Sequence, residues 1–276
     1  MLAAASRSER TVTIDDDLHL IGSIVERWFA RFEGFRQALQ QAPADGTGFA
    51  FDVSVVRGDP STFAQSNGFI NNALDALVAL GGMWNEHRFH VPSDYVLLRA
   101  AYENALKAGW MLAPDDSADR NARAWALARS GPDTAKRKAT AALKRHPDSK
   151  AKTDIISICR EAKGALERVD ARFEGTAIIL EVGARLDTTS LAESVESETW
   201  FEHGKNPVNG AVQLWSELSG LAHGERAHVA YRSVHTETHG HVHVTEPNVE
   251  MLAKCANLVD RFVGHALDLF VLRATS

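Results

Sequence analysis

Three charged residues repeat at a helical spacing near the middle of the chain: Arg99, Glu103 and Lys107 are each four positions apart. On a helix, residues with this spacing lie along one stripe. The stripe is either a surface ladder of ion pairs or, if it faces a neighbouring helix, a polar site. The spacing leaves both interpretations open. Arg99 and Glu103 are therefore candidate catalytic residues, and Asn104 beside them is a candidate binding residue.

A second polar pair, Ser219 and His223, lies four positions apart just before Gly224. A histidine at the end of a helix can simply interact with the helix dipole, or it can act as a general base or contact a phosphate. A serine hydrolase is not indicated, because a serine inside a helix lacks the strained elbow that exposes such a nucleophile. His223 is thus the third candidate catalytic residue, and Ser219 is a candidate binding residue.

Histidines are concentrated near a turn late in the chain. They are His235, His239, His241 and His243. Three alternating strand positions span about 13 Å, so three such histidines cannot share one metal ion. Cys159 and Cys255 are far apart, and neither has metal-ligand spacing to other residues. We therefore expect no metal and no cofactor.

These residues must be positioned by helices, because apolar residues recur mainly at steps of three and four. The first such run is a seam with seven-residue spacing from Leu18 to Leu39. Helices are predicted over 17–41, 67–87, 92–112, 115–130, 133–145, 148–172, within 188–201, over 206–222 and from 248 onwards. Breaks are expected at Gly131-Pro132 and at His146-Pro147, and Gly81-Gly82 suggests a kink or a close helix crossing.

Four segments have strand-like patterns. Alternating apolar residues over 49–55 allow a short strand, and 176–186 fits a strand or a helix. The runs 229–234 and 241–245 flank a turn at His239-Gly240 and predict a β-hairpin. The predicted fold class is therefore mainly α: a single helical-bundle domain with a minor β-hairpin near residues 229–245.

Composition agrees with one globular domain: the chain has 276 residues, of which 45% are hydrophobic and 24% charged. We expect residues 1–14 to be disordered or frayed, and residues 15–276 to form the single helical domain with a basic helical arm at 120–152. No stretch is apolar enough to span a membrane, and no signal peptide is evident. The expected location is the cytoplasm, with no membrane partner.

Charge is distributed unevenly along this domain. The formal net charge is −6, but residues 120–152 contain ten Lys and Arg against Asp133 and Asp148. That segment carries +8, so the remainder carries −14. Such an arm can bind RNA or another phosphate-bearing partner. It can equally dock on the acidic face of this chain or of a second subunit. The acidic face would comprise Glu193, Glu196, Glu198 and Glu202.

Two motifs resemble a group of uncharacterised actinobacterial helical proteins. The first is LLRAAYENALKAGWMLAPDD, followed by Arg120 and Arg123, and the second is LWSELSGLAHGE. They match the patterns L-R-A-x-x-E-N…W-x-L-x-P and S-G-x-A-H-G of that group. The resemblance implies no established activity. Arg120 and Arg123, which follow the first motif, complete the candidate binding residues.

The chain is also distantly similar to HEPN-type helical domains, several of which are ribonucleases or toxin partners. The similarity implies a metal-independent ribonuclease with an arginine four to six positions before its histidine. No arginine precedes His223 at that distance, so a composite site would need Arg99 or Arg120 to approach it in space.

These patterns support three functional hypotheses. The leading one is a helical-bundle protein that acts through assembly or partner binding, with a homodimer as the expected assembly. Its support is the apolar seam of the first helix, which is typical of a bundle helix, together with the opposed charge segments. The alternative is a HEPN-like nucleic-acid-binding protein or ribonuclease with a non-standard polar site. The second alternative is a small-molecule pocket between the helix that carries Arg99 and the helix that carries Ser219.

Overall fold

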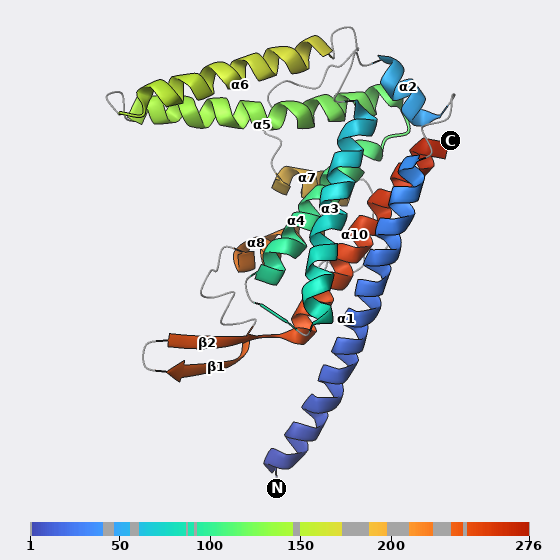
Figure 1. The fold of residues 1–276 in the computed structure, drawn as a ribbon, viewed down its shortest axis with the longest axis vertical. Coiled ribbons are helices and arrows are strands. Elements are labelled where there is room, and N and C mark those ends of the chain that lie inside the picture. Colours follow the sequence, from blue (N-terminus) through green and yellow to red (C-terminus); the bar gives the residue numbers. More distant parts are fainter. Residues whose placement is uncertain are drawn as a thin grey trace.

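The computed structural model shows a helical bundle from which a long two-helix arm projects (Figure 1). It describes residues 2–40, 47–55, 61–86, 88–90, 93–145, 150–172, 188–197, 210–222, 233–239 and 242–275. The helices are α1 (Leu2–Gln40), α2 (Gly48–Val55), α3 (Thr62–Asn85), α4 (Ser93–Leu112), α5 (Ser117–Arg145), α6 (Lys152–Arg172), α7 (Thr188–Ser197), α8 (Ala211–Ala222) and α10 (Val249–Thr275). The predicted mainly α class is confirmed.

The described strands form one two-stranded antiparallel sheet, β1 (Ser233–His239) with β2 (Val242–Pro247). The sequence predicts the first strand from residue 229, whereas β1 begins at Ser233. His223 and the remainder of 223–232 lie outside the described residues, as does the segment 176–186.

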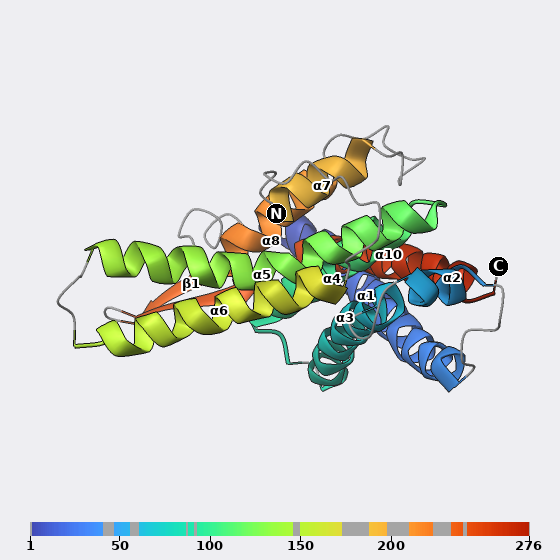
Figure 2. The ribbon, with the colours of Figure 1, turned by 90° about the horizontal axis from the view of Figure 1, so that it is seen from above.

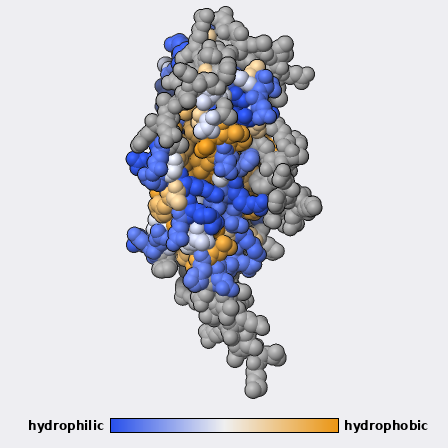
Figure 3. All heavy atoms as spheres, turned by 90° about the vertical axis from the view of Figure 1, so that its right-hand side faces the viewer, coloured by the Kyte–Doolittle hydropathy of each residue, from blue (hydrophilic) through white to orange (hydrophobic). Residues whose placement is uncertain are grey.

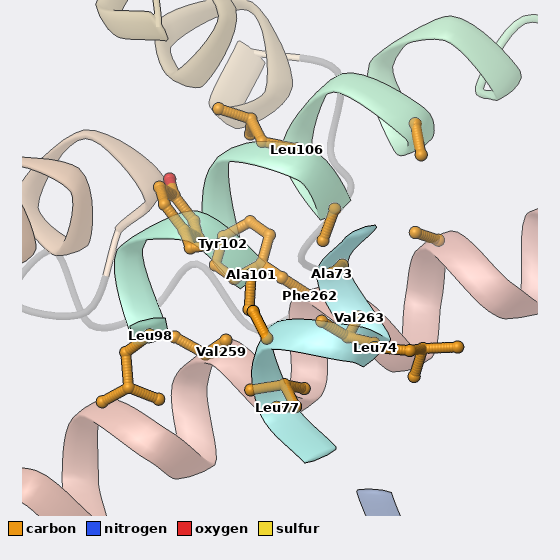
Figure 4. Packing of buried hydrophobic residues seen from close by; sticks show 14 of the residues in the cluster. Ala73, Leu74, Leu77, Leu98, Ala101, Tyr102, Leu106, Val259, Phe262 and Val263 are labelled. Atoms are coloured by element: carbon orange, nitrogen blue, oxygen red, sulfur yellow. The ribbon is translucent and has the colours of Figure 1, made fainter. Parts of the chain in front are cut away.

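The centre of the bundle is the contact of α3, α4 and α10. Leu77 of α3, Leu98 of α4 and Val259 of α10 are all fully buried in one cluster (Figure 4). Tyr102 and Phe262 meet there edge to face, with ring centroids 4.8 Å apart. Burial of these side chains supplies the main stabilisation of the bundle.

α1 packs its apolar seam inside the chain. Ile21, Val25, Trp28 and Phe35 are buried against the bundle, and α1 contacts both α10 and α3. A Cβ atom on Gly81 would lie 3.0 Å from Val25, so this glycine permits the close crossing of α3 and α1. Most of the seam is therefore used inside the chain and is not available to a second subunit, and the homodimer stays a prediction.

A buried carboxylate strengthens the contact between α1 and α10. Asp260 of α10 pairs with Arg31 and, at 3.0 Å, with Nε of Arg27, both from α1.

On the face of the molecule shown in Figure 3, hydrophobic side chains lie in separate patches among hydrophilic ones. Among the described residues on that side, no single large apolar face of the kind that marks a subunit interface is visible.

The structure corrects three predictions about secondary structure. Residues 49–55 form α2 instead of a strand, because Phe49 and Asp52, three positions apart, are both buried and so share one helical face. α5 continues through Gly131-Pro132, where its contact with α6 compensates for the hydrogen bond that proline cannot donate. α1 begins at Leu2 and not at Asp17, because the Ala-rich start favours a helix, so the expected frayed segment 1–14 is helical from residue 2.

Asp94 fixes the beginning of α4. Its Oδ2 accepts hydrogen bonds from Nε1 of Trp84 and from the backbone N–H of His90, each at 3.0 Å. Oδ1 is buried without a partner among the described residues. Burial raises the pKa of Asp94, and the two hydrogen bonds only partly oppose this shift.

This raised pKa predicts a characteristic pH dependence of stability. A carboxyl whose pKa is higher in the folded than in the unfolded protein binds protons more tightly when folded, so it stabilises the fold as the pH falls. The wild type should therefore gain stability relative to Asp94→Asn as the pH falls from 7 towards the ordinary aspartate pKa, about 3.9. Urea unfolding of both proteins across this range measures the difference. A difference that is constant, or that changes in the opposite direction, contradicts the assignment.

Candidate functional site

The basic segment 120–152 is divided by the fold into two parts. Arg120, Arg123 and Arg129 belong to the half of α5 nearest the bundle. Seven further cations lie beyond Pro132 on the arm that α5 and α6 form together, where the two helices run side by side (Figures 1 and 2). The two groups have different environments.

Arg120 is almost completely buried, with 3% of its side chain exposed, and it pairs with Asp52 of α2, which is wholly buried. Its Nε and Nη2 contact the two oxygens of Asp52, both at 2.9 Å. Nη1 donates to the carbonyl oxygens of Pro114 and Asp115, and Nη2 also reaches that of Gly48 at 3.4 Å. A guanidinium has five N–H groups, and these five contacts use all of them. Arg120, a candidate binding residue, therefore has no N–H group left for a phosphate in this structure.

A second arginine holds the same connection between α4 and α5. Arg273 of α10 donates to the carbonyl oxygens of Leu112 and Pro114, at 3.2 and 2.9 Å. It also pairs with Asp115 at 2.8 Å. The hydrogen bond and charge of Arg273 lower the pKa of Asp115. Arg273 thus satisfies the carbonyl of Leu112, which has no partner within α4, and Arg120 and Arg273 together hold the carbonyls of the connection that follows.

Arg123 also contacts the end of α4. Its Nη1 donates to the carbonyl oxygen of Trp110 at 2.6 Å, and its guanidinium lies 4.9 Å from the Trp110 ring centroid. The first sequence motif therefore has a structural explanation: its two following arginines fasten α5 to α4. The predicted phosphate-binding role of Arg123 has no support in this geometry.

The predicted catalytic residues are only partly brought together. Nε of Arg99 lies 2.7 Å from Oε1 of Glu103, and each side chain is about a quarter exposed, at 23% and 22%. Asn104 donates to the carbonyl oxygen of Ala100 in its own helix. Ser219 is half-buried on α8, and His223 lies outside the described residues.

Arg120 cannot join Arg99 in a composite site. Arg120 contacts carbonyls beyond Leu112, the last residue of α4, whereas Arg99 lies thirteen residues before that end. At 1.5 Å per residue, the two positions are separated by about 20 Å along α4. Of the two arginines that the HEPN-like hypothesis named, Arg99 alone remains available to it.

Two large side chains connect α4 to its neighbours α7 and α8. The buried Tyr102 hydroxyl donates to the carbonyl oxygen of Ala211, the first residue of α8, at 2.6 Å. Nε1 of Trp110 donates to Oγ of Ser194 on α7 at 3.1 Å. These two contacts join α4 to α7 and α8 on the side where the sequence suggests a small-molecule pocket, and that pocket stays a prediction.

The far part of the basic segment is open to solvent. All of its seven cations are exposed: Lys136, Arg137, Lys138, Lys144, Arg145, Lys150 and Lys152. Among the described residues, the ion pairs of these seven are limited to Arg137 with Asp133, at 3.4 Å. Glu193 of α7 is exposed and forms no ion pair with the described part of the arm, and the side chains of the other three acidic-face residues lie outside the described set.

At the base of the arm, Asp170 of α6 connects α6 to α5. Asp170 pairs with Arg129 and accepts a hydrogen bond from Nε1 of Trp125 at 3.0 Å. The Arg129 guanidinium also lies 4.8 Å from the Trp125 ring centroid. The one aromatic residue of the segment 120–152 is thus engaged at the base, far from the seven exposed cations.

No family model, curated protein or solved structure matches this chain. Within the described residues, no helix is long and apolar enough to cross a membrane. Nor does this part of the chain contain a group of three or more histidine, cysteine or acidic side chains that could hold a metal ion.

Replacing Arg120 tests its structural role. Arg120→Ala leaves the buried Asp52 carboxylate without its partner, and removal of one member of a buried ion pair costs about 3–5 kcal/mol. Arg120→Lys should recover little, because lysine cannot make the two-pronged contact. The matched control is Arg99→Ala, which removes an arginine that is about a quarter exposed and paired within its own helix, and it should cost about 1 kcal/mol or less. Urea unfolding measures all three, and equal losses for Arg120→Ala and Arg99→Ala would contradict this account.

Proposed function

We propose that this protein binds nucleic acid through the exposed cations of the arm and acts as a binding protein, without catalysis. The observation that carries the proposal is the set of seven solvent-exposed Lys and Arg beyond Pro132, with only Arg137 paired in the described residues. Exposed cations of one sign that project from a protein attract the phosphate backbone and release its counterions. This develops the nucleic-acid-binding part of the alternative hypothesis, without its catalytic site.

Charge along the arm supports the same conclusion. After Lys152, α6 has four cations and four carboxylates, so the remainder of this helix is neutral. The excess positive charge is concentrated on the far half of α5 and at the connection to α6. An arm that served only solubility would not need this concentration, whereas a phosphate-binding tip does.

The bundle supports this role by holding the arm in place. α5 contacts α2, α3 and α4 through its first half, and Arg120 and Arg123 fasten that half to the end of α4. The second half of α5 pairs with α6. Binding energy is therefore not spent on ordering the arm, which improves affinity for a stiff partner.

The proposal predicts binding to RNA that depends steeply on salt. With three to five phosphates contacted, affinity should fall between about tenfold and 10³-fold from 50 to 200 mM salt. Changing all seven exposed cations to glutamine should abolish this binding while the helical circular dichroism signal is retained. Fluorescence anisotropy with a labelled RNA measures it. Absence of wild-type binding at 50 mM salt, or unchanged binding by the variant, would refute the proposal.

Ribonuclease activity is a second candidate, favoured by one observation: the half-buried contact of Arg99 with Glu103. In this candidate the pair and His223 would act on a bound RNA, which the resemblance to HEPN-type domains suggests. Cleavage of a labelled RNA that Arg99→Ala removes, with binding unchanged, would establish it. The predicted homodimer stays a separate prediction, which light scattering tests.

A further inference from the structure

We propose that the backbone of a nucleic-acid duplex binds in a shallow depression on one face of α5, rimmed by Lys136, Arg137 and Lys144. The depression has a volume of about 290 Å³, and Thr140 and Ala141 line it together with these cations and Asp133. This inference rests on the proposed function and makes it specific, because it names one face of the arm and one form of nucleic acid.

The lining residues have the spacing of a single helical face. Positions 133, 136, 137, 140, 141 and 144 follow one another at steps of three, one, three, one and three. Thr140 and Ala141 are small, and longer cationic side chains stand on either side of them. Lys136 and Lys144 lie about 12 Å apart along the helix axis, a distance that spans several phosphates of one strand.

Charge in the depression favours an anion. Three cations face one carboxylate, Asp133, which pairs with Arg137 at 3.4 Å while both side chains are about half exposed. Nη2 of Arg137 also donates to Oγ1 of Thr134 at 3.1 Å. Lys136 and Lys144 form no ion pair among the described residues. They are the groups whose ammonium ions can reach a phosphate without first losing a partner.

Thr140 acts by its small size and not as a ligand. Its hydroxyl donates to the carbonyl oxygen of Lys136 at 2.8 Å and lies 4.0 Å from Sγ of Cys159 on α6. The hydroxyl proton is therefore used within the helix, which leaves the lysine and arginine side chains as the donors to a phosphate.

The arm fits a duplex better than a single strand. Proteins bind single strands by stacking bases on aromatic side chains. Trp125, the one aromatic residue of 120–152, is engaged by Asp170 and Arg129 at the base. A duplex offers about one charge per 1.7 Å along a stiff axis, which matches cations held at fixed spacing on a helix. Contacts of this kind are to phosphates and are independent of base sequence.

The same helix supplies a matched control. Lys138 and Arg145 are also exposed, but successive helical positions are rotated by about 100°, so they lie on a different face from the depression. Lys136→Gln with Lys144→Gln, and Lys138→Gln with Arg145→Gln, each remove two positive charges from the far half of α5. Overall charge is the same in the two double variants, and only the face differs.

The test uses the full chain and a fluorescein-labelled 20-base-pair RNA duplex, with anisotropy measured from 50 to 200 mM salt. The Lys136/Lys144 variant should bind at least tenfold more weakly, and its salt slope should be smaller by about two. The Lys138/Arg145 variant should lose less than threefold. Equal thermal unfolding midpoints of the two variants exclude a folding defect. Equal weakening by both variants would overturn the proposal that the depression is the binding site, but not the proposal that the arm binds nucleic acid.

Two further readouts are decisive. Asp133→Asn removes the competing carboxylate and should tighten duplex binding two- to threefold, whereas Asp154→Asn on α6, with the same change of charge, should not. No difference between these variants would overturn the inference. So would tighter binding to a 20-nucleotide single strand, to inorganic polyphosphate or to anionic phospholipid vesicles than to the duplex. Absence of all binding by the wild type would overturn the inference and the proposed function together.

Discussion

The buried ion pair of Arg120 with Asp52 is the contact on which the arrangement of the arm depends. Burial of two opposite charges is costly, and it is tolerated when every donor and acceptor has a partner. Here the guanidinium satisfies Asp52, Gly48, Pro114 and Asp115, while Oγ of Ser117 adds a contact to Asp52 at 2.5 Å. One side chain thereby links α2, the end of α4 and the start of α5. Since α5 is continuous through Pro132, this link sets the direction of the whole arm.

Charge in this chain has two uses that the net value of −6 conceals. Near the bundle, Arg120, Arg123 and Arg129 have protein partners and act as structural fasteners. Beyond Pro132, positive side chains are exposed and concentrated on α5. The paired arginines near the bundle hold α5 in place. The exposed cations beyond Pro132 therefore keep a fixed spacing, which cations on a flexible tail lack.

The helices were largely predictable because they depend on local patterns. The run from Pro247 and Asn248 predicted α10, and the structure shows Asn248 capping it by accepting a hydrogen bond from the N–H of Met251 at 3.1 Å. The sequence suggests a strand over 49–55 because apolar residues alternate with others there. A run this short is equally compatible with a helix that buries one face, which is what α2 does. Pro132 was expected to end a helix, but the contact with α6 outweighs its local preference.

The site was less predictable, because burial of a charged residue depends on contacts between distant segments. Arg120 and Asp52 are 68 positions apart, and nothing in either local sequence marks them as partners. The apolar seam of α1 favours a bundle helix already in the sequence, and its contacts with α3 and α10 agree with that, but the sequence does not say which helices it meets. By contrast, the excess of positive charge over 120–152 was visible in the sequence, since it depends on composition alone.

The most direct test of the central claim is to map lysine reactivity by mass spectrometry, with a lysine-specific acylating reagent and with or without an RNA duplex. Lys163 of α6 and Lys254 of α10 are internal references, because each is exposed and paired with a glutamate on its own helix. The account predicts that the duplex protects Lys136 and Lys144 strongly and leaves the two references unchanged. Protection that is equal at all four lysines, or greatest at Lys254, would contradict it.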